Sequence, residues 1–322
     1  HMPPEAKYAV FEIGMNHAGE IAPLAQLVRP HVAMVTAIAP VHLEYFGTIE
    51  AIADAKAEIF SGVESGGCAV LNRDDAQFER LRAHAAEAGV GRIVSFGAHA
   101  QSDARLIEAA LKPDCSTVRA RILGEDVTYK IGAPGRHLVM NSLGVLAAAS
   151  LAGADLAVAA LALAQLTPPA GRGRQHAVAV AGGFVTVIDE SYNANPASMR
   201  AALAVLGQTP VSRHGRRIAV LGDMLELGAA REKLHRDLLD PVLDHGVDLL
   251  FCCGPQMRAL WQALPSERRG GYAETAAALE PVVLAAMRAG DVVMVKGSLG
   301  SRMGPIVEAL RRTSLDAPAQ AS

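Results

Sequence analysis

The chain has 322 residues, of which 51% are hydrophobic and 20% are charged, and its 33 acidic and 30 basic residues leave a formal net charge of -3. This length and composition allow two separate hydrophobic cores, so we expect a globular chain of two domains. The near balance of charge argues against nucleic acid or an anionic membrane as a partner, and no apolar run is long enough to be inserted in a membrane.

Apolar runs that alternate with helical patterns predict an α/β fold with a mostly parallel sheet in the first half of the chain. We expect strands at residues 9–13, 32–38, 68–71 and 93–96, and helices near 49–60 and 75–88. Short alternating runs between residues 104 and 131 predict antiparallel strands appended to this sheet. Two helices follow, at about 138–152 and 155–166, and Asp155 is the expected N-cap of the second.

Residues 167–173 (TPPAGRG) combine proline and glycine between two patterned regions and predict a domain boundary. We therefore expect domains at 1–169 and 170–313 and a flexible tail at 314–322. The second domain repeats the α/β alternation and is predicted to be Rossmann-like. Its strands are expected near residue 178 and at 185–188, 218–221, 249–253 and 292–295, with a last helix that ends near residue 312. The four irregularly spaced cysteines suggest reduced thiols in a cytoplasmic protein.

The segment 188–199 (IDESYNANPASM) ends an apolar strand on a carboxylate and then gathers polar side chains in a turn. Asp189 closes the strand, and Asn195 and Pro196 keep the chain out of helix until Ser198. Ligands of open α/β sheets bind at such carboxyl ends of strands. The alternative is an ordinary strand-to-helix loop with Asn caps, and the segment alone favours neither reading.

Two other strand ends carry groups that bind cations. Glu12 closes the first expected strand, and His42 and Glu44 follow the second. A carboxylate and an imidazole at adjacent strand ends can share a divalent cation, and oxygen-rich surroundings favour magnesium or manganese over zinc. Each of these residues taken singly is more often a loop residue than a ligand.

Lys56 lies in the expected helix at 49–60, four residues after Ile52 and one turn before Phe60, so it falls on or beside the buried stripe. A desolvated amine has a lowered pKa and is nucleophilic, so it can take up carbon dioxide as a carbamate. This change converts a cation into a carboxylate-like ligand. The alternative is a lysine whose ammonium reaches the surface, and the residues alone favour that alternative.

Six motifs resemble the Mur ligase family in their order and spacing. They are FEIGMNHAGEI, HLEYFGTIEAIADAKAEIF, GRHLVMNSLGVLAAA, IDESYNANPASMRAAL, VLGDMLELG and VMVKGS, and the resemblance as a whole runs from about residue 8 to residue 312. The resemblance implies an incomplete central ATPase domain followed by a C-terminal ligase domain. It also implies an ATP-dependent amide ligase of peptidoglycan synthesis, a cytoplasmic monomer that adds D-alanyl-D-alanine to UDP-N-acetylmuramoyl-tripeptide through an acyl phosphate.

The resemblance implies roles for residues of the first domain. Glu12 and His42 resemble ligands of Mg²⁺, and Lys56 resembles a carbamylated lysine that holds a second Mg²⁺. His137 and Asn141 belong to a motif that resembles the family's nucleotide site, in which the asparagine reads the adenine of ATP.

The resemblance implies roles in the second domain as well. Arg174 resembles an arginine that reaches the phosphates or ribose of ATP after the domains close. Other residues resemble groups of the nucleotide and dipeptide sites: Asp189 and Asn195 for the nucleotide, and Tyr192, Ser198, Lys296 and Ser298 for the substrate.

The chain departs from the family in one respect. The family carries a GxxGK[ST] loop that cradles the phosphates of ATP, and this chain contains no Gly-Lys dipeptide. We therefore expect a ligase truncated before or through that loop, without the UDP-sugar domain and without turnover. The alternatives are a folylpolyglutamate-synthase-like ligase, against which ESYNANPASM and LGDMLELG argue, and a non-catalytic binding module.

Overall fold

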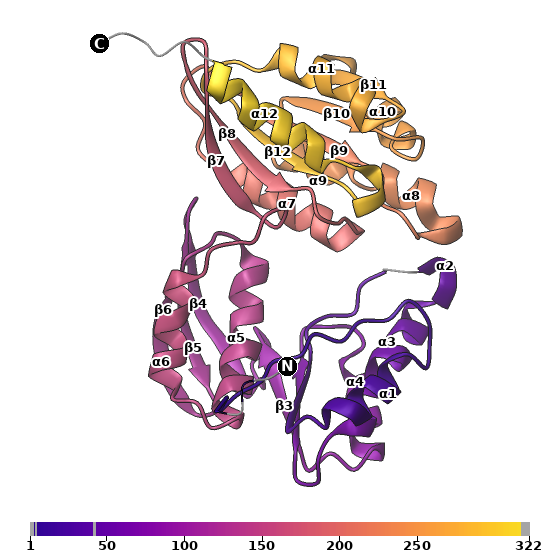
Figure 1. Cartoon of the computed structure of the whole chain (residues 1–322), viewed down its shortest axis with the longest axis vertical. Helices are drawn as coiled ribbons and strands as arrows, with labels where there is room; N and C mark the ends of the chain where they lie inside the picture. Colours follow the sequence, from indigo (N-terminus) through magenta and orange to yellow (C-terminus); the bar gives the residue numbers. More distant parts are fainter. Residues whose placement is uncertain (1–2, 4, 41–42, 317–322) are drawn as a thin grey trace. The chain divides into compact units, whose positions relative to one another are not determined.

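The computed structural model of the chain describes residues 3, 5–40 and 43–316. The chain divides into two units, residues 1–166 and 167–322. Each unit contains a six-stranded sheet with helices packed on both faces (Figure 1), so the predicted α/β fold is confirmed. No described helix is both long and apolar enough to cross a membrane.

The sheet of unit 1 has the strand order β1-β2-β3-β4-β5-β6. Its strands are β1 (Val32–Val35), β2 (Cys68–Asn72), β3 (Arg92–Gly97), β4 (Ala104–Leu111), β5 (Ser116–Ile122) and β6 (Glu125–Ile131). Strands β1 to β4 are parallel, whereas β4, β5 and β6 pair antiparallel. The predicted antiparallel extension is therefore confirmed. Strand β5 alternates buried and exposed residues along its length, which is the pattern of a strand with one face in the core.

The helices of unit 1 cover both faces of its sheet. They are α1 (Ile21–Val28), α2 (Leu43–Phe46), α3 (Ile49–Ala57), α4 (Phe78–Glu87), α5 (Arg136–Leu151) and α6 (Leu156–Ala162). Helices α3 and α4 bury Ala53 and Leu81 against one face, and α5 buries Val139 and Leu143 against the other. Asp155 caps α6 as predicted, because its carboxylate accepts a 2.9 Å hydrogen bond from the amide of Val158. Helix α1 was not expected.

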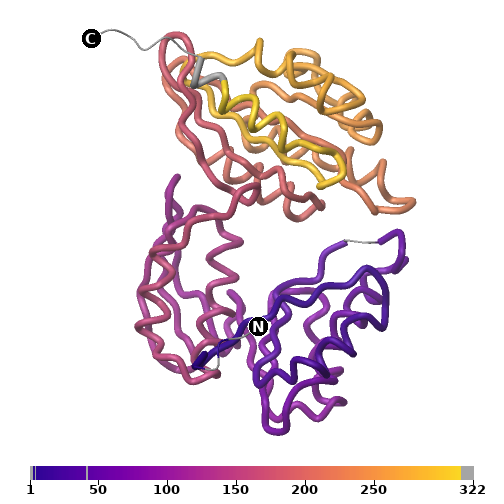
Figure 2. The backbone as a smooth tube through the Cα atoms, viewed as in Figure 1, coloured from indigo at the N-terminus to yellow at the C-terminus, as the bar shows by residue number. Residues whose placement is uncertain are grey.

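The prediction of a strand at residues 9–13 is wrong. Residues 8–15 form no strand and run as irregular chain before α1 (Figure 2), with Val10 98% and Phe11 57% exposed. A strand exists only where its backbone pairs with a neighbour, and among the described residues β1 pairs with β2 alone. The apolar pattern of the segment indicated a propensity for strand, but no described residue pairs with its backbone as a neighbouring strand would.

The sheet of unit 2 has the order β11-β10-β9-β12-β8-β7. Its strands are β7 (Arg174–Val180), β8 (Gly183–Glu190), β9 (Arg217–Gly222), β10 (Leu249–Cys253), β11 (Arg269–Ala273) and β12 (Val292–Lys296). Five strands are parallel, and β7 pairs antiparallel with β8 at one edge. Strand β11 was not predicted, because its sequence RGGYA contains two glycines and no apolar run.

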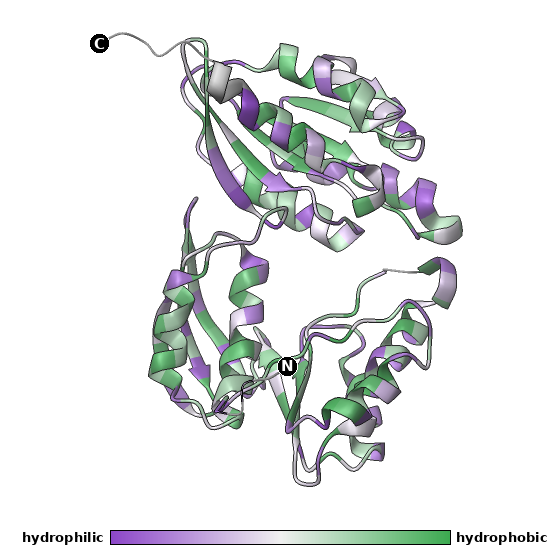
Figure 3. Ribbon diagram, viewed as in Figure 1, coloured by the Kyte–Doolittle hydropathy of each residue, from purple (hydrophilic) through white to green (hydrophobic). Residues whose placement is uncertain are grey.

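The helices of unit 2 lie on both faces of its sheet. Helices α7 (Pro196–Gln208), α8 (Arg231–Arg236), α9 (Leu239–Asp244) and α10 (Arg258–Ala263) border one apolar core, and α11 (Ala276–Ala286) and α12 (Gly304–Asp316) border the other. Figure 3 shows apolar residues along the central strands, whereas α12 mixes polar and apolar residues. Helix α12 continues four residues past the predicted end at residue 312, into the predicted tail, and residues 317–322 lie outside the described part of the chain.

A topological switch point lies between β9 and β12. These strands are neighbours, yet the chain leaves β9 toward the face that carries α8 and α9 and leaves β12 toward the face that carries α12. The two connections therefore separate at the carboxyl ends of the strands. Ligands of open α/β sheets bind at such points, so the polar groups at this edge are the first candidates for a site.

Candidate functional site

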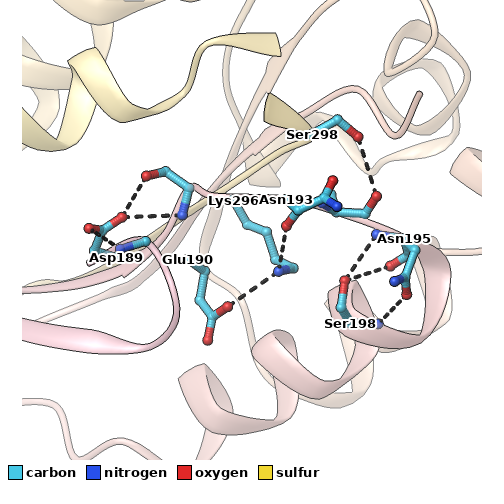
Figure 4. A network of polar contacts seen from close by, with 10 residues as sticks. Asp189, Glu190, Asn193, Asn195, Ser198, Lys296 and Ser298 are labelled. Carbon is cyan, nitrogen blue, oxygen red and sulfur yellow. Dashed lines mark hydrogen bonds and ion pairs between the residues drawn. The ribbon is translucent and has the colours of Figure 1, made fainter. Parts of the chain in front are cut away.

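Five of the residues predicted for the second domain lie at the carboxyl edge of the sheet of unit 2 (Figure 4): Asp189, Asn195, Ser198, Lys296 and Ser298. Glu190 ends β8 and Lys296 ends β12, and parallel pairing places the two residues opposite each other. The Lys296 ammonium lies 3.3 Å from a Glu190 carboxylate oxygen and donates a 3.0 Å hydrogen bond to the carbonyl of Asn193. The segment after β8 is thus fastened to the end of β12.

Lys296 is an interior group. Its side chain is 3% exposed, against 15% for that of Glu190. Burial lowers the pKa of the Lys296 ammonium, and the neighbouring Glu190 carboxylate opposes that effect. Since its donors point at protein acceptors, Lys296 holds the edge of the sheet together.

Asp189 anchors the chain that enters unit 2. Its buried carboxylate accepts hydrogen bonds from the amide of Gly171 at 2.8 Å and from the hydroxyl of Ser191 at 2.6 Å. Gly171 has a φ of 75°, and a Cβ atom there would lie 2.8 Å from the Cβ of Tyr192. Glycine is therefore required at the point where this segment crosses the loop. Tyr192 is 46% exposed, and the guanidinium of Arg172 lies 4.2 Å from its ring centroid.

Asn195 and Ser198 form the N-terminal cap of α7. The Asn195 side-chain oxygen accepts a 2.8 Å hydrogen bond from the Ser198 amide, and the Ser198 hydroxyl accepts a 2.9 Å hydrogen bond from the Asn195 amide. Pro196 occupies the first helical position, where its missing amide hydrogen costs nothing. The hydrogen bonds of both side chains are those of the ordinary capping loop that the sequence offered as an alternative.

Ser298 joins three loops at the switch point. Its hydroxyl accepts a 2.9 Å hydrogen bond from the amide of Leu225, in the loop after β9, and donates to the carbonyl of Ala194, in the loop after β8, at 3.3 Å. The residue is 5% exposed. Gly297 beside it has no room for a side chain, because a Cβ atom would lie 2.3 Å from the Ser301 hydroxyl oxygen. The hydrogen bonds of Ser298 therefore hold the loops after β8, β9 and β12 in contact with one another.

A buried histidine supports the same edge and was missed in the sequence. The amide of Met224 donates a 2.9 Å hydrogen bond to Nε2 of His235, and Nδ1 of His235 lies 2.7 Å from the carbonyl of Arg231. This pairing requires neutral His235 with its proton on Nδ1. Asp223, which follows β9, accepts a 2.8 Å hydrogen bond from the amide of Met257. The motif VLGDMLELG pointed to this loop, but no local pattern connects His235 to it.

Stability should fall as pH drops below about 6.5, because burial lowers the pKa of His235 from its usual 6.5. Below that value His235 is protonated in the unfolded chain but stays neutral in the folded chain. The free energy of unfolding should therefore fall by up to about 1.4 kcal/mol per pH unit, until the pH reaches the pKa of His235 in the folded chain. Chemical denaturation at pH values from about 7.5 to about 5, which span the usual pKa of histidine, measures the slope of the free energy of unfolding against pH. His235→Gln should lose that part of the slope, and an unchanged profile would contradict the assignment. Burial raises the pKa of Asp223, which acts in the opposite direction at lower pH.

The chain neighbours of the three predicted metal ligands come together in unit 1. One apolar cluster contains Ile52 and Ala55 of α3, which precede Lys56 in the chain, and Ile13 and Leu43 pack against it. Ile13 follows Glu12, and Leu43 follows His42, which itself lies outside the described residues. Packing therefore places Ile13 and Leu43, the chain neighbours of Glu12 and His42, against α3.

The side chains of this region give a partial fit to a metal site. Burial lowers the pKa of Lys56, and its ammonium forms no hydrogen bond or ion pair with the described residues. These are the properties that carbamate formation requires. Glu12 is exposed, and within residues 3, 5–40 and 43–316 no three His, Cys, Asp or Glu side chains gather as a metal site would require.

The predicted nucleotide residues lie at the starts of two elements. His137 and Asn141 are exposed residues one helical turn apart in the first half of α5, after Gly135, whose φ of 114° starts the helix. Arg174 is exposed at the start of β7, opposite Asp189 of β8 in the antiparallel register. His137 and Asn141 belong to unit 1 and Arg174 to unit 2.

Both units match known protein families. Residues 1–149 match the Mur ligase middle domain, and residues 173–299 match the Mur ligase glutamate ligase domain. The UDP-N-acetylmuramoyl-tripeptide–D-alanyl-D-alanine ligases of Rickettsia prowazekii (strain Madrid E) and Escherichia coli (strain K12) are 30% and 34% identical to the chain over 95% and 96% of its length. The chain covers 67% and 66% of these relatives, and so spans about two thirds of their length.

A solved structure agrees with these matches. MurF from Acinetobacter baumannii superposes with a TM-score of 0.84 at 28% identity, over 97% of this chain and 66% of that one. The similarity runs through both units and includes the segments that carry the site residues. The chain therefore belongs to the Mur ligase family.

Proposed function

We propose that this chain carries the nucleotide and dipeptide surfaces of an ATP-dependent ligase that adds D-alanyl-D-alanine to UDP-N-acetylmuramoyl-tripeptide in peptidoglycan synthesis. The observation that carries the proposal is the similarity of about 95% of the chain to relatives that share this name. We place the reaction in the cytoplasm and take the protein to be a monomer.

The proposed reaction has two steps. ATP transfers its terminal phosphoryl group to the carboxylate of the tripeptide, which gives an acyl phosphate and ADP. The amine of D-alanyl-D-alanine then attacks the acyl carbon, an amide bond forms, and inorganic phosphate leaves with the electrons of the broken C–O bond. Positioning and neutralisation of charge are the main tasks of a protein in phosphoryl transfer.

Unit 1 is proposed to carry part of the surface for the nucleotide and its cations. Lys56, as a carbamate, and Glu12 and His42 would bind two Mg²⁺ ions, which when bound neutralise the charge on the phosphoryl oxygens. The lowered pKa of Lys56 and the apolar cluster beside it support this assignment. Asn141 is proposed to contact the adenine from α5, and His137, one turn earlier, is proposed to belong to the same nucleotide site.

Unit 2 is proposed to supply Arg174 for the phosphates or ribose of ATP and Tyr192 for the dipeptide, since both side chains are exposed. The interior positions of Asp189, Lys296 and Ser298 suit a second task, which is to fix the loops that border the site. Asn195 and Ser198 would act through the start of α7, which they cap. These five residues are therefore proposed as positioning residues of the nucleotide and substrate sites.

Titration of the chain with each ligand alone tests the proposal. D-alanyl-D-alanine should perturb NMR amide signals at the carboxyl edge of unit 2 without any nucleotide. Mg²⁺ and ATP should not bind with micromolar affinity, and the chain should not turn over, because its sequence has no Gly-Lys phosphate loop. Failure of the dipeptide to bind would contradict the substrate assignment, and tight ATP binding would show that the loop is dispensable.

A further inference from the structure

Two loops at the switch point of unit 2 expose apolar side chains beside the buried polar groups. These switch-point loops comprise residues 223–228 after β9 and residues 297–303 after β12. Leu225 is 37% exposed and Leu299 is 68% exposed. The loops touch, because the Leu225 amide donates to the Ser298 hydroxyl and a Cβ atom at Gly300 would lie 2.7 Å from a methyl carbon of Leu225. The two leucines therefore belong to one surface.

The backbone of both loops is held in an unusual conformation. Glu226 has a φ of 62° and Arg302 has a φ of 54°, and these are two of four non-glycine residues with positive φ among the described residues. Such a conformation persists only where the surrounding contacts enforce it, and it is concentrated at functional sites. In these loops the enforcing contacts include the hydrogen bonds of the Ser298 hydroxyl to Leu225 and Ala194. The positions of Leu299 and Arg302 are thus set by the fold.

The loop after β12 offers one exposed cation. The resemblance assigned Lys296 to the substrate, but its ammonium is buried and already paired with Glu190. Arg302, six residues later, is exposed, and its guanidinium forms no hydrogen bond or ion pair with the described residues. An unpaired guanidinium is well suited to a carboxylate, which it can bind through two parallel hydrogen bonds.

We propose that Arg302, Leu225 and Leu299 determine the specificity of the dipeptide site. Arg302 binds the terminal carboxylate of the dipeptide, and the two leucines contact its methyl groups. The assignment rests on the proposed function, because D-alanyl-D-alanine combines one terminal carboxylate with small apolar side chains. In this assignment, exposed residues of the switch-point loops contact the substrate in place of the interior Lys296 and Ser298.

The carboxylate contact is tested with two probes, D-alanyl-D-alanine and D-alanyl-D-alanine amide, which lacks the terminal charge. The wild-type chain should bind the acid about tenfold more tightly than the amide, because a hydrogen-bonded charge pair is lost with the amide. R302Q should bind both probes with the weaker affinity. Arg312→Gln, which removes an exposed arginine of α12 from the same unit, should retain the tenfold preference.

The apolar contact is tested with glycylglycine, which lacks both methyl groups. Wild type should prefer D-alanyl-D-alanine by about tenfold, since the transfer of two methyl groups from water is worth roughly that factor. Leu299→Ser should reduce this preference at least about threefold, on the same basis. Leu161→Ser removes a leucine that is 72% exposed on α6 of unit 1 and should leave the preference unchanged.

The outcomes separate the inference from the proposed function. If wild type binds none of the probes, the dipeptide assignment falls and the inference falls with it. If wild type binds D-alanyl-D-alanine but R302Q keeps the preference for the acid, the role of Arg302 is overturned while the proposed function stands. Thermal melts of each variant identify a change in folding, and R302K, which keeps the positive charge, should recover part of the preference.

Discussion

Asp291→Ala is expected to lower the free energy of unfolding of unit 2 by about 3–5 kcal/mol, because the substitution leaves a partly buried guanidinium without its anion. The Asp291 side chain is fully buried, and its carboxylate lies 2.6 Å from the guanidinium of Arg216, which is 21% exposed. The same carboxylate accepts hydrogen bonds from the amides of Arg216 and Arg288. One residue thus closes the loops at the amino end of β12.

Thermal or urea denaturation measures this effect. The expected loss corresponds to a fall in Tm of roughly 6–20 °C for a unit of this size. Glu274→Ala is the matched control, because Glu274 pairs with Arg258 on the surface, where the two side chains are 53% and 56% exposed. It should cost less than about 1 kcal/mol. Equal effects of the two substitutions would show that burial does not determine the strength of the Asp291 pair.

Lys296→Met is expected to destabilise unit 2 by about 2–4 kcal/mol, with little change in side-chain volume. Removal of the ammonium leaves the Glu190 carboxylate, 15% exposed, without its cation and the Asn193 carbonyl without its donor. Part of the loss is offset because the methionine side chain carries no charge to desolvate. Denaturation again provides the measurement. D-alanyl-D-alanine should also bind more weakly, because the loop after β8 loses its attachment to β12.

A second substitution separates the ion pair from simple packing. Glu190→Gln in the Lys296→Met background removes the uncompensated carboxylate, so the double variant should be more stable than Lys296→Met alone. If the two substitutions instead add to a larger loss, the pair does not carry the coupling that its geometry indicates. Comparison of all four proteins at one pH gives the coupling free energy directly.

The features that depend on neighbours in the chain could be predicted from the residues alone. Apolar runs located most strands, Asp155 was identified as a helix cap, and the proline and glycine of residues 167–173 lie where one unit gives way to the next. These signals are local, since burial period, capping and turn chemistry are decided within a few residues. The sequence also placed Lys56 beside a buried stripe, and burial lowers its pKa.

The contacts of the polar groups in these elements could not be predicted in this way, because they are made with residues that only folding brings close. Residues 9–13 have the composition of a strand but pair with none of the strands that the structure describes, and β11 pairs in spite of its glycines. Asp189 and Lys296 were expected to face ligands, yet they bind Gly171 and Glu190 inside unit 2. The partner of a strand and the partner of a buried charged side chain are groups distant in the chain, so a local sequence pattern does not predict them.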